Sequence, residues 1–347
     1  MRQNASCPIY LRPDYLRTVY LLGSADTGQS AAITLSADGR VHGTKDYARY
    51  GFQDDRLYLL DQAGQKRARL RHHPEANGFF PDDATALYMV PLLTLDPPPP
   101  PVGNARLLVN TIPKSGTYLL DLVLARIGYH GLGLHLIPRE CHDNRGVALD
   151  IIHRAPFSRR IFAPASAVTR IMAPGEYTVG HVASGAELTA IASTGVGIIQ
   201  CQRDLREVLV SLYRFKRKSV DPVSSADRLW RHLNGPDGFL AFLCTYAEGE
   251  LTDLRDFTQL MPQLPGVLLR FEDLIAGVIP PASRTALDHL DEDLGEMMAA
   301  ILPDCLGHDS STLTAARTDW RAHWSKAAEE FFERSGLLAA NRGLGYQ

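Results

Sequence analysis

The sequence contains few cysteines and no long apolar segment. Its five cysteines are scattered over 347 residues, are odd in number and show no CxxC spacing. This pattern excludes a disulfide framework and is typical of reduced thiols in a cytoplasmic protein. No run reaches the roughly 20 apolar residues needed to cross a bilayer, and the N-terminus has no apolar core of signal-peptide length. We therefore expect a cytoplasmic protein without membrane insertion.

The sequence also lacks a large excess of charge of either sign. A formal net charge of -3 argues against a general nucleic-acid binder, which is usually basic. A local anion site is still allowed, because a few arginines can dominate one pocket. A content of 45% hydrophobic and 22% charged residues is ordinary for a globular protein, and the length suits about two domains.

A run of five prolines, Pro97–Pro101, separates two regions of different texture. Polyproline is extended and fairly stiff, so residues 97–103 are predicted to be a linker. Before it, runs such as "TVYLL" and "RLYLL" alternate with Gly-containing turns such as "DQAGQ" and "EANG". Residues 1–96 are therefore predicted to form a small antiparallel β domain.

After the prolines, residues 104–347 show an α/β pattern. Short apolar runs at 106–110, 196–202 and 266–271 are candidate buried strands, and each is followed by a loop and a helical pattern. Strands that alternate with helices predict a central parallel sheet covered on both faces, in a three-layer α/β fold.

The stretch "LLVNTIPKSGTYLL" joins the first of these strands to a helix and carries Lys114, Ser115, Gly116 and Thr117. The first N–H groups of a helix lack internal partners, and the helix dipole places partial positive charge there. Gly116 lets the backbone approach a ligand, Ser115 and Thr117 add hydroxyl donors, and Lys114 adds a full charge. The pattern predicts an anion site.

The anion is not predicted to be ATP with magnesium. The motif of the nucleotide triphosphatases is GxxxxGK[ST], in which the lysine lies at the start of the helix. Here Lys114 precedes the glycine, at the entrance of the loop.

A second stretch, "IIQCQRDLREVLVSLYRF", has the same strand–turn–helix pattern and carries Arg203 and Ser211. An arginine at a helix N-terminus is unfavourable unless an anion is present, so Arg203 also points to anion binding.

Together the two stretches resemble the nucleotide-binding signatures of the sulfotransferases that use 3'-phosphoadenosine 5'-phosphosulfate (PAPS). The family patterns are approximately PKSGTTWL and R-[ND]-P-x-[DE]-x-x-x-S-x-[YF], and their separation of about 90 residues also fits. "LLRFEDL" is similar to the family's LRYEDL, and "TDWRAHWS" with the final "GLGY" is similar to GDWRxHF and LGY. The resemblance covers residues 104–347 and implies a P-loop-like fold.

The resemblance also implies roles for individual residues. Lys114 would contact the bridging oxygen and 5'-phosphate of PAPS, and amides from Ser115 to Tyr118 would hold the phosphosulfate. Arg203 and Ser211 would bind the 3'-phosphate, the group that distinguishes PAPS from ATP. No metal is implied.

Transfer to a hydroxyl requires a base, and histidine suits that task near neutral pH. "YTVGHVASG" places His181 upstream of the strand that leads to Arg203. A histidine in a similar place is the general base of the family, so His181 is our candidate, although the KTHLP-type sequence around the family's histidine is absent. A structural histidine is the alternative.

The sequence departs from the family pattern at several positions. Tyr118 and Leu119 replace Thr-Trp, so adenine stacking cannot be carried over there, and Leu205 replaces a proline. The RKG element that adds 3'-phosphate contacts is not evident, and Arg317 or Arg321 is the candidate replacement.

The histidines of "YHGLGLHLIPRECHD" suggest a metal at first sight. Their spacing matches no zinc pattern, and the segment lies where sulfotransferases commonly build part of the acceptor pocket. A substrate-facing role is the better prediction for some of them. The run "RFKRKS", residues 214–219, is most simply predicted to be a solvated helix end, and the alternative is that it attracts an acidic acceptor.

We therefore predict a PAPS-dependent sulfotransferase acting on a hydroxyl of a carbohydrate, lipid or small natural product. One alternative is a nucleotide-dependent kinase or other phosphotransferase on a related fold. Another is a non-catalytic carbohydrate-binding protein in which the β domain binds the glycan.

Overall fold

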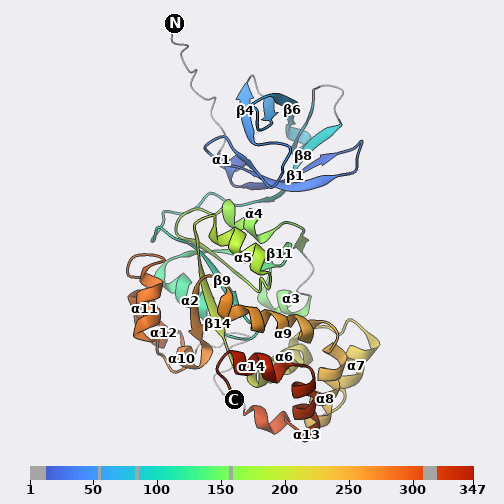
Figure 1. Cartoon of the computed structure of the whole chain (residues 1–347), viewed down its shortest axis with the longest axis vertical. Coiled ribbons are helices and arrows are strands. Elements are labelled where there is room, and N and C mark those ends of the chain that lie inside the picture. Colours follow the sequence, from blue (N-terminus) through green and yellow to red (C-terminus); the bar gives the residue numbers. More distant parts are fainter. Residues whose placement is uncertain (1–12, 54–55, 83–85, 156–158, 308–318) are drawn as a thin grey trace. The chain divides into compact units, whose positions relative to one another are not determined.

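The computed structural model describes most of the chain, namely residues 13–53, 56–82, 86–155, 159–307 and 319–347. Helices and strands are both abundant, and the strands form two sheets, so the protein is a mixed α/β chain as predicted (Figure 1). Within the described ranges, no helix is long and apolar enough to span a bilayer.

The chain divides into two compact units. One is Met1–Pro99 with Ile161–Ala173, and the other is Pro100–Arg160 with Pro174–Gln347. The division at Pro99 lies inside the proline run. Residues 161–173 differ from the sequence-based expectation, since they group with the first unit rather than with the α/β region.

The first unit is built on an eight-stranded sheet. Its strands are β1 (Thr18–Ser24), β2 (Ser30–Leu35), β3 (Val41–His42), β4 (Arg49–Gln53), β5 (Arg56–Leu60), β6 (Lys66–His73), β7 (Gly78–Pro81) and β8 (Leu87–Thr94). Their order is β3-β2-β1-β8-β7-β6-β5-β4, and the pairings among the described strand residues are antiparallel. In β6, Ala68 and Leu70 are buried while Arg67 and Arg69 are exposed, the alternation of a strand with one face in the core.

The turn between β5 and β6 shows why the sequence forms hairpins here. The Asp61 carboxylate accepts hydrogen bonds from the amides of Ala63 and Gln65, at 2.9 and 3.0 Å. Gly64 takes a positive φ of 77°, which favours glycine. Three short helices complete the unit: α1 (Pro13–Leu16), η1 (Pro74–Ala76) and α4 (Ala165–Arg170).

The second unit contains a seven-stranded sheet. In order across the sheet, the strands are β12 (Arg160–Ile161), β11 (Glu140–Asp143), β10 (His130–Ile137), β13 (Glu176–Gly180), β9 (Arg106–Thr111), β14 (Val196–Gln202) and β15 (Val267–Arg270). The four neighbouring pairs from β10 to β15 are parallel, and β10–β11 is an antiparallel hairpin. The strand predicted at 266–271 is shorter than expected, because Phe271 begins a helix.

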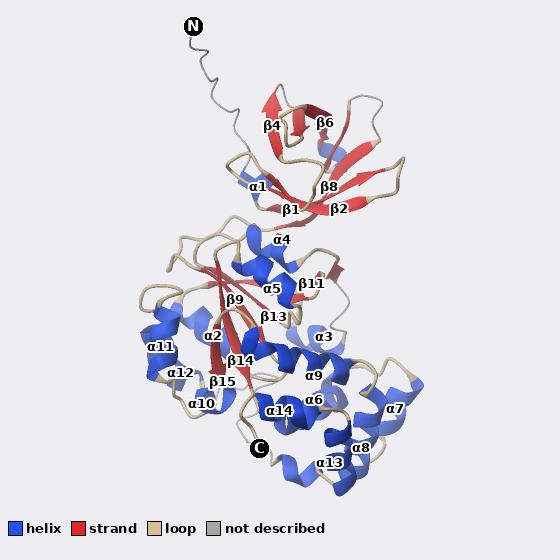
Figure 2. Cartoon of the chain, viewed as in Figure 1, coloured by secondary structure: helices blue, strands red, loops and turns tan. Residues whose placement is uncertain are grey.

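Helices lie on either side of this sheet (Figure 2). They are α2 (Thr117–Ile127), α3 (Leu149–Arg154), α5 (Gly185–Ala192), α6 (Leu205–Ser219), α7 (Ser225–Arg231), α8 (Gly235–Tyr246), α9 (Glu250–Leu260), η2 (Met261–Gln263), α10 (Phe271–Ile275), α11 (Pro281–Asp288), α12 (Leu294–Cys305), η3 (Trp320–His323), α13 (Lys326–Arg334) and α14 (Leu337–Gly343). One core cluster joins α2, α11 and α12 to β9 and β14, and a second joins α6, α8, α9, α13 and α14.

Helix α2 shows how packing places the predicted anion turn. Leu119, Leu120, Val123 and Leu124 are all 0% exposed. Burying each side chain contributes roughly 1.5–3 kcal/mol, so the helix is held firmly against the sheet. Its N-terminus is thereby fixed next to the end of β9.

Candidate functional site

The predicted site segments leave the sheet at one edge. β9, β13 and β14 are parallel neighbours, with Gly180 opposite Asn110 and Cys201 opposite Thr111. The carboxyl ends of parallel strands in an open α/β sheet are where ligands commonly bind. The turn after β9, His181 after β13 and Arg203 after β14 therefore come together, although they are far apart in sequence.

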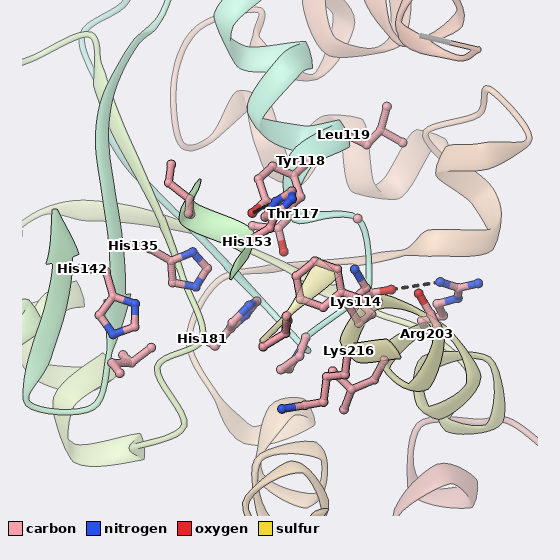
Figure 3. Close-up of a pocket in the computed structure, with 18 of the residues that line it drawn as sticks. Lys114, Thr117, Tyr118, Leu119, His135, His142, His153, His181, Arg203 and Lys216 are labelled. Atoms are coloured by element: carbon pink, nitrogen blue, oxygen red, sulfur yellow. Dashed lines mark hydrogen bonds between the residues drawn. The ribbon is translucent and has the colours of Figure 1, made fainter. Parts of the chain in front are cut away.

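These segments line a pocket of about 360 Å³ (Figure 3). Its walls come from the β9–α2 turn, the β10–β11 hairpin, and helices α3, α6 and α9. Of the predicted site residues, those that line it are Lys114, Gly116, Thr117, Tyr118, His181, Arg203 and Ser211.

The turn before α2 has an uncommon backbone. Lys114 has φ 66° and Gly116 has φ 97°, both in the left-handed region. A Cβ on Gly116 would lie 2.9 Å from Cδ2 of Phe271, so glycine is required both by conformation and by space. Ser115 is fully buried beside the pocket, and its hydroxyl has no hydrogen-bond partner among the described residues. The first amides of a helix have no partners within the helix, so the start of α2 offers donors beside the pocket.

Lys114 is a cation held in a poorly solvated position. Its Nζ lies 4.1 Å from the ring centroid of Phe215. Burial, with a smaller contribution from the charge of Arg203, lowers the pKa of Lys114 to about 8. A bound anion would favour the charged form and raise this pKa.

Arg203 connects the two predicted motifs. Its Nη1 donates to the main-chain oxygen of Lys114 at 2.9 Å, the dashed line in Figure 3. Its Nε and Nη2 donate to Oε2 of Glu207 at 3.1 and 2.9 Å, and its guanidinium lies 4.3 Å from the Phe271 ring centroid. The sequence did not reveal this arrangement, which holds the arginine against the lysine turn.

Of the remaining residues predicted to contact the nucleotide, Ser211 faces the pocket and Arg321 does not line it. Ser211 is half-buried on α6 and faces the pocket. The Arg321 side chain is 72% exposed, donates to Asp319 at 3.4 Å and lies over Trp320; it is not among the residues that line the pocket. Arg317 lies outside the described residues.

His181 is oriented by the backbone. Its Nδ1 lies 2.8 Å from the main-chain oxygen of Thr111, and its amide donates to Leu136 at 2.8 Å. A carbonyl oxygen only accepts, so Nδ1 carries the proton and Nε2 carries the lone pair. Burial first, and then the nearby charge of Lys114, lowers the pKa of His181 to about 4. The imidazole is therefore neutral at physiological pH.

Two further histidines line the pocket and were only broadly anticipated. The register of the β10–β11 hairpin places His135 opposite His142, on one face of the sheet. Their ring centroids are 6.3 Å apart, and those of His135 and His181 are 4.6 Å apart (Figure 3). The alternation of leucine with other residues in "HGLGLHL" indicated a strand, but the sequence carried no signal that would pair His135 with His142. Among the described residues, no group of three ligating side chains is arranged to hold a metal.

The opposite wall includes residues that sequence reasoning missed. The Tyr118 hydroxyl lies 3.3 Å from Nε2 of His153. Lys216 was predicted to be solvated within 214–219, but its side chain is only 16% exposed and lies 2.8 Å from Glu250. The prediction was wrong for Lys216 because α6 turns this side chain inward, toward α9.

The pocket therefore brings the side chains of Lys114 and Arg203 and the neutral imidazole of His181 to one cavity. No protein-family model and no curated protein matches the chain. Among solved structures, the chain is similar to a mouse sulfotransferase in complex with PAP, at 11% identity and a TM-score of 0.40, over 70% of this chain and 89% of the mouse chain. So distant a likeness carries no information about the reaction of this chain.

Proposed function

We propose that the chain is a sulfotransferase that moves a sulfuryl group from PAPS to an acceptor hydroxyl. The observation that carries the proposal is the convergence of Lys114, Arg203, Ser211 and His181 on one pocket at the end of parallel strands. The second unit would then be a P-loop-like three-layer domain, and the first unit an accessory β domain.

The donor would be bound at the N-terminus of α2. The amides of Gly116–Tyr118 and the charge of Lys114 would hold the 5'-phosphosulfate, where the helix dipole favours negative charge. The Ser115 amide, which was also expected to contribute, donates instead to the main-chain oxygen of Ile112 at 3.1 Å. Lys114 has little solvent around it in the pocket, and the bound phosphosulfate would stabilise its charge instead. The lysine would therefore be fully protonated in the complex. In this scheme the residues of the chain supply the charge stabilisation, and no metal is required.

The 3'-phosphate would be bound by Arg203 and Ser211. The hydrogen bonds of Arg203 to Lys114 and Glu207 use three of its five N–H groups, so the guanidinium can hold the turn and donate to a phosphate at once. Arg317 or Arg321 stays a predicted contact of this phosphate, as a replacement for the family's RKG element, which the sequence lacks.

The reaction would be an in-line displacement at sulfur. The acceptor oxygen forms a new S–O bond, the bond from sulfur to the bridging oxygen breaks, and adenosine 3',5'-bisphosphate leaves. Lys114 would stabilise the charge that grows on the leaving phosphate. His181 Nε2 would take the proton of the acceptor hydroxyl.

The protonation states of His181 and Lys114 suit these two roles. His181 is neutral, so Nε2 is ready to accept a proton. Lys114 lowers the pKa of His181, and a bound phosphosulfate would offset that lysine charge. Donor binding would thereby make His181 a stronger base when it is needed.

Nucleotide binding tests the proposal most directly. We expect adenosine 3',5'-bisphosphate to raise the thermal midpoint more than adenosine 5'-phosphate or ATP with magnesium does. Transfer of radiolabelled sulfate from PAPS to a panel of carbohydrate, lipid and natural-product hydroxyls would then identify the acceptor class.

The same screen separates the alternatives. Stabilisation by magnesium-ATP alone would favour a kinase or other phosphotransferase. Glycan binding by the full chain without any nucleotide response would favour a carbohydrate-binding protein.

A further inference from the structure

A chain of three side chains connects the predicted phosphate turn to the predicted base. The Thr111 and Thr117 hydroxyl oxygens lie 2.6 Å apart. Thr111 Oγ1 is 3.4 Å from His181 Nδ1, which also contacts the Thr111 main-chain oxygen at 2.8 Å. Thr117 borders the pocket, whereas Thr111 is 0% exposed.

The donors and acceptors of this chain are limited. His181 Nδ1 holds a proton because it contacts a carbonyl oxygen, so the Thr111 hydroxyl can only accept from the ring. Between the two threonines, either hydroxyl can be the donor while the pocket is empty. An oxyanion in the turn changes that, because an anion accepts only, and the Thr117 hydroxyl proton would turn toward it.

The hydroxyl proton of Thr111 can then be donated to one partner only. With Thr117 donating to the anion, the Thr111 hydroxyl must donate to Thr117 Oγ1. Its lone pairs are then available to the His181 Nδ1–H. The result is a row of hydrogen bonds with one direction, from imidazole to Thr111 to Thr117 to the anion. Bonds aligned in this way polarise and strengthen one another.

We propose that Thr111 is a positioning residue that couples oxyanion binding at Thr117 to the proton affinity of His181 Nε2. The inference rests on the proposed function, in which His181 is the base, and adds a residue that neither donor nor acceptor touches. No proton is transferred along the row; the hydroxyls only change the direction in which they donate. The base would be strengthened only when the donor turn is occupied.

Other charged or titratable groups also face His181, and the test must separate their effects. Lys114 acts from the β9–α2 turn, and His135 and His142 act from the β10–β11 hairpin. Their through-space effects do not depend on the Thr111 hydroxyl. Thr111→Val removes that hydroxyl while it keeps the branched shape and the main-chain oxygen that holds Nδ1. Thr111→Ser keeps the hydroxyl and is the matched control.

The experiment is ¹⁵N NMR of histidine-labelled protein, in which His181→Gln identifies the His181 signals. The wild type, Thr111→Val and Thr111→Ser are titrated from about pH 3 to about pH 8, a range that includes the His181 pKa of about 4, without ligand and with saturating adenosine 3',5'-bisphosphate. In the bound state we expect the pKa of His181 in the wild type and in Thr111→Ser to exceed that in Thr111→Val by about half a unit. Without ligand, the pKa of His181 should differ less among the three proteins.

If the pKa of His181 in the nucleotide-bound state is the same in the wild type and in Thr111→Val, the inference is overturned. If Thr111→Val does not fold, Thr111→Ala is measured in its place. If adenosine 3',5'-bisphosphate does not bind, the proposed function fails. The same titration with inorganic sulfate then tests the inference separately. It can do so because the hydrogen-bonded row from His181 to Thr117 responds to any oxyanion in the turn. An unchanged His181 signal at saturating sulfate would then refute it.

Discussion

Replacing Arg203 is the sharpest test of how the nucleotide is recognised. The guanidinium lies beside the lysine turn and is predicted to bind the 3'-phosphate. A hydrogen bond to a charged group contributes about 1.5–3 kcal/mol, which corresponds to about 10- to 150-fold in affinity. Arg203→Ala should therefore weaken adenosine 3',5'-bisphosphate by about that factor. Adenosine 5'-phosphate, which lacks the group, should lose much less.

The structure adds a complication that the design must handle. Arg203 also holds the main-chain oxygen of Lys114 and pairs with Glu207, so its loss disturbs the turn and leaves a half-buried carboxylate without this ion pair. Glu207→Gln is the matched control, because it breaks the ion pair and leaves the guanidinium in place. We expect this control to keep the preference for adenosine 3',5'-bisphosphate.

The assay is calorimetric titration of the wild type and both variants with the two nucleotides, at one fixed salt concentration, since phosphate contacts are screened by salt. Thermal midpoints of all three proteins report on folding. The reasoning is refuted if Arg203→Ala weakens the two nucleotides equally while it stays folded. That result would mean that Arg203 shapes the turn and does not read the 3'-phosphate.

Three further predictions concern the reaction and its pH dependence. Lys114→Ala should reduce kcat by about 10²–10³ or more, since it removes charge stabilisation at the leaving group, and near-normal turnover in the sulfate-transfer assay would exclude that role. His181→Gln should lower activity by about 10²–10⁴ while calorimetry shows unchanged nucleotide affinity; undiminished activity would move the base elsewhere. The pKa of Lys114 is about 8 in the empty pocket, and a bound anion raises it, so nucleotide binding takes up a proton above that pH. Nucleotide affinity should therefore fall, by up to about tenfold for each pH unit above 8, in the wild type but not in Lys114→Met. An equal dependence of affinity on pH in the two proteins would contradict the role of Lys114 in anion binding.

Local patterns were enough for much of the fold. The strands at 196–202 and 106–110 were readable because buried strands of a parallel sheet are short apolar runs. The hairpin at Asp61 was readable from its turn residues, and the helix after 106–110 from the helical pattern that follows this strand. These features depend on neighbours within a few positions, which sequence alone records.

Other features depend on packing between distant segments. Lys216 looked solvated because charge runs usually are, yet α6 directs it toward Glu250 on α9. His135 and His142 became neighbours only through strand register, which fixes which side chains share a face. The contact of Arg203 with the Lys114 main chain required two parallel strands to end at the same edge.

The sequence by itself determined the chemical groups of the site: a lysine-led turn, an arginine and serine on a second turn, and a histidine. Each of these groups was readable from a short local run of residues. Only the tertiary structure decided that they face one pocket, that the Thr111 main chain sets the histidine tautomer, and that burial lowers the pKa of Lys114 to about 8. Those properties arise from burial and from contacts between segments far apart in the chain, and no local pattern encodes them.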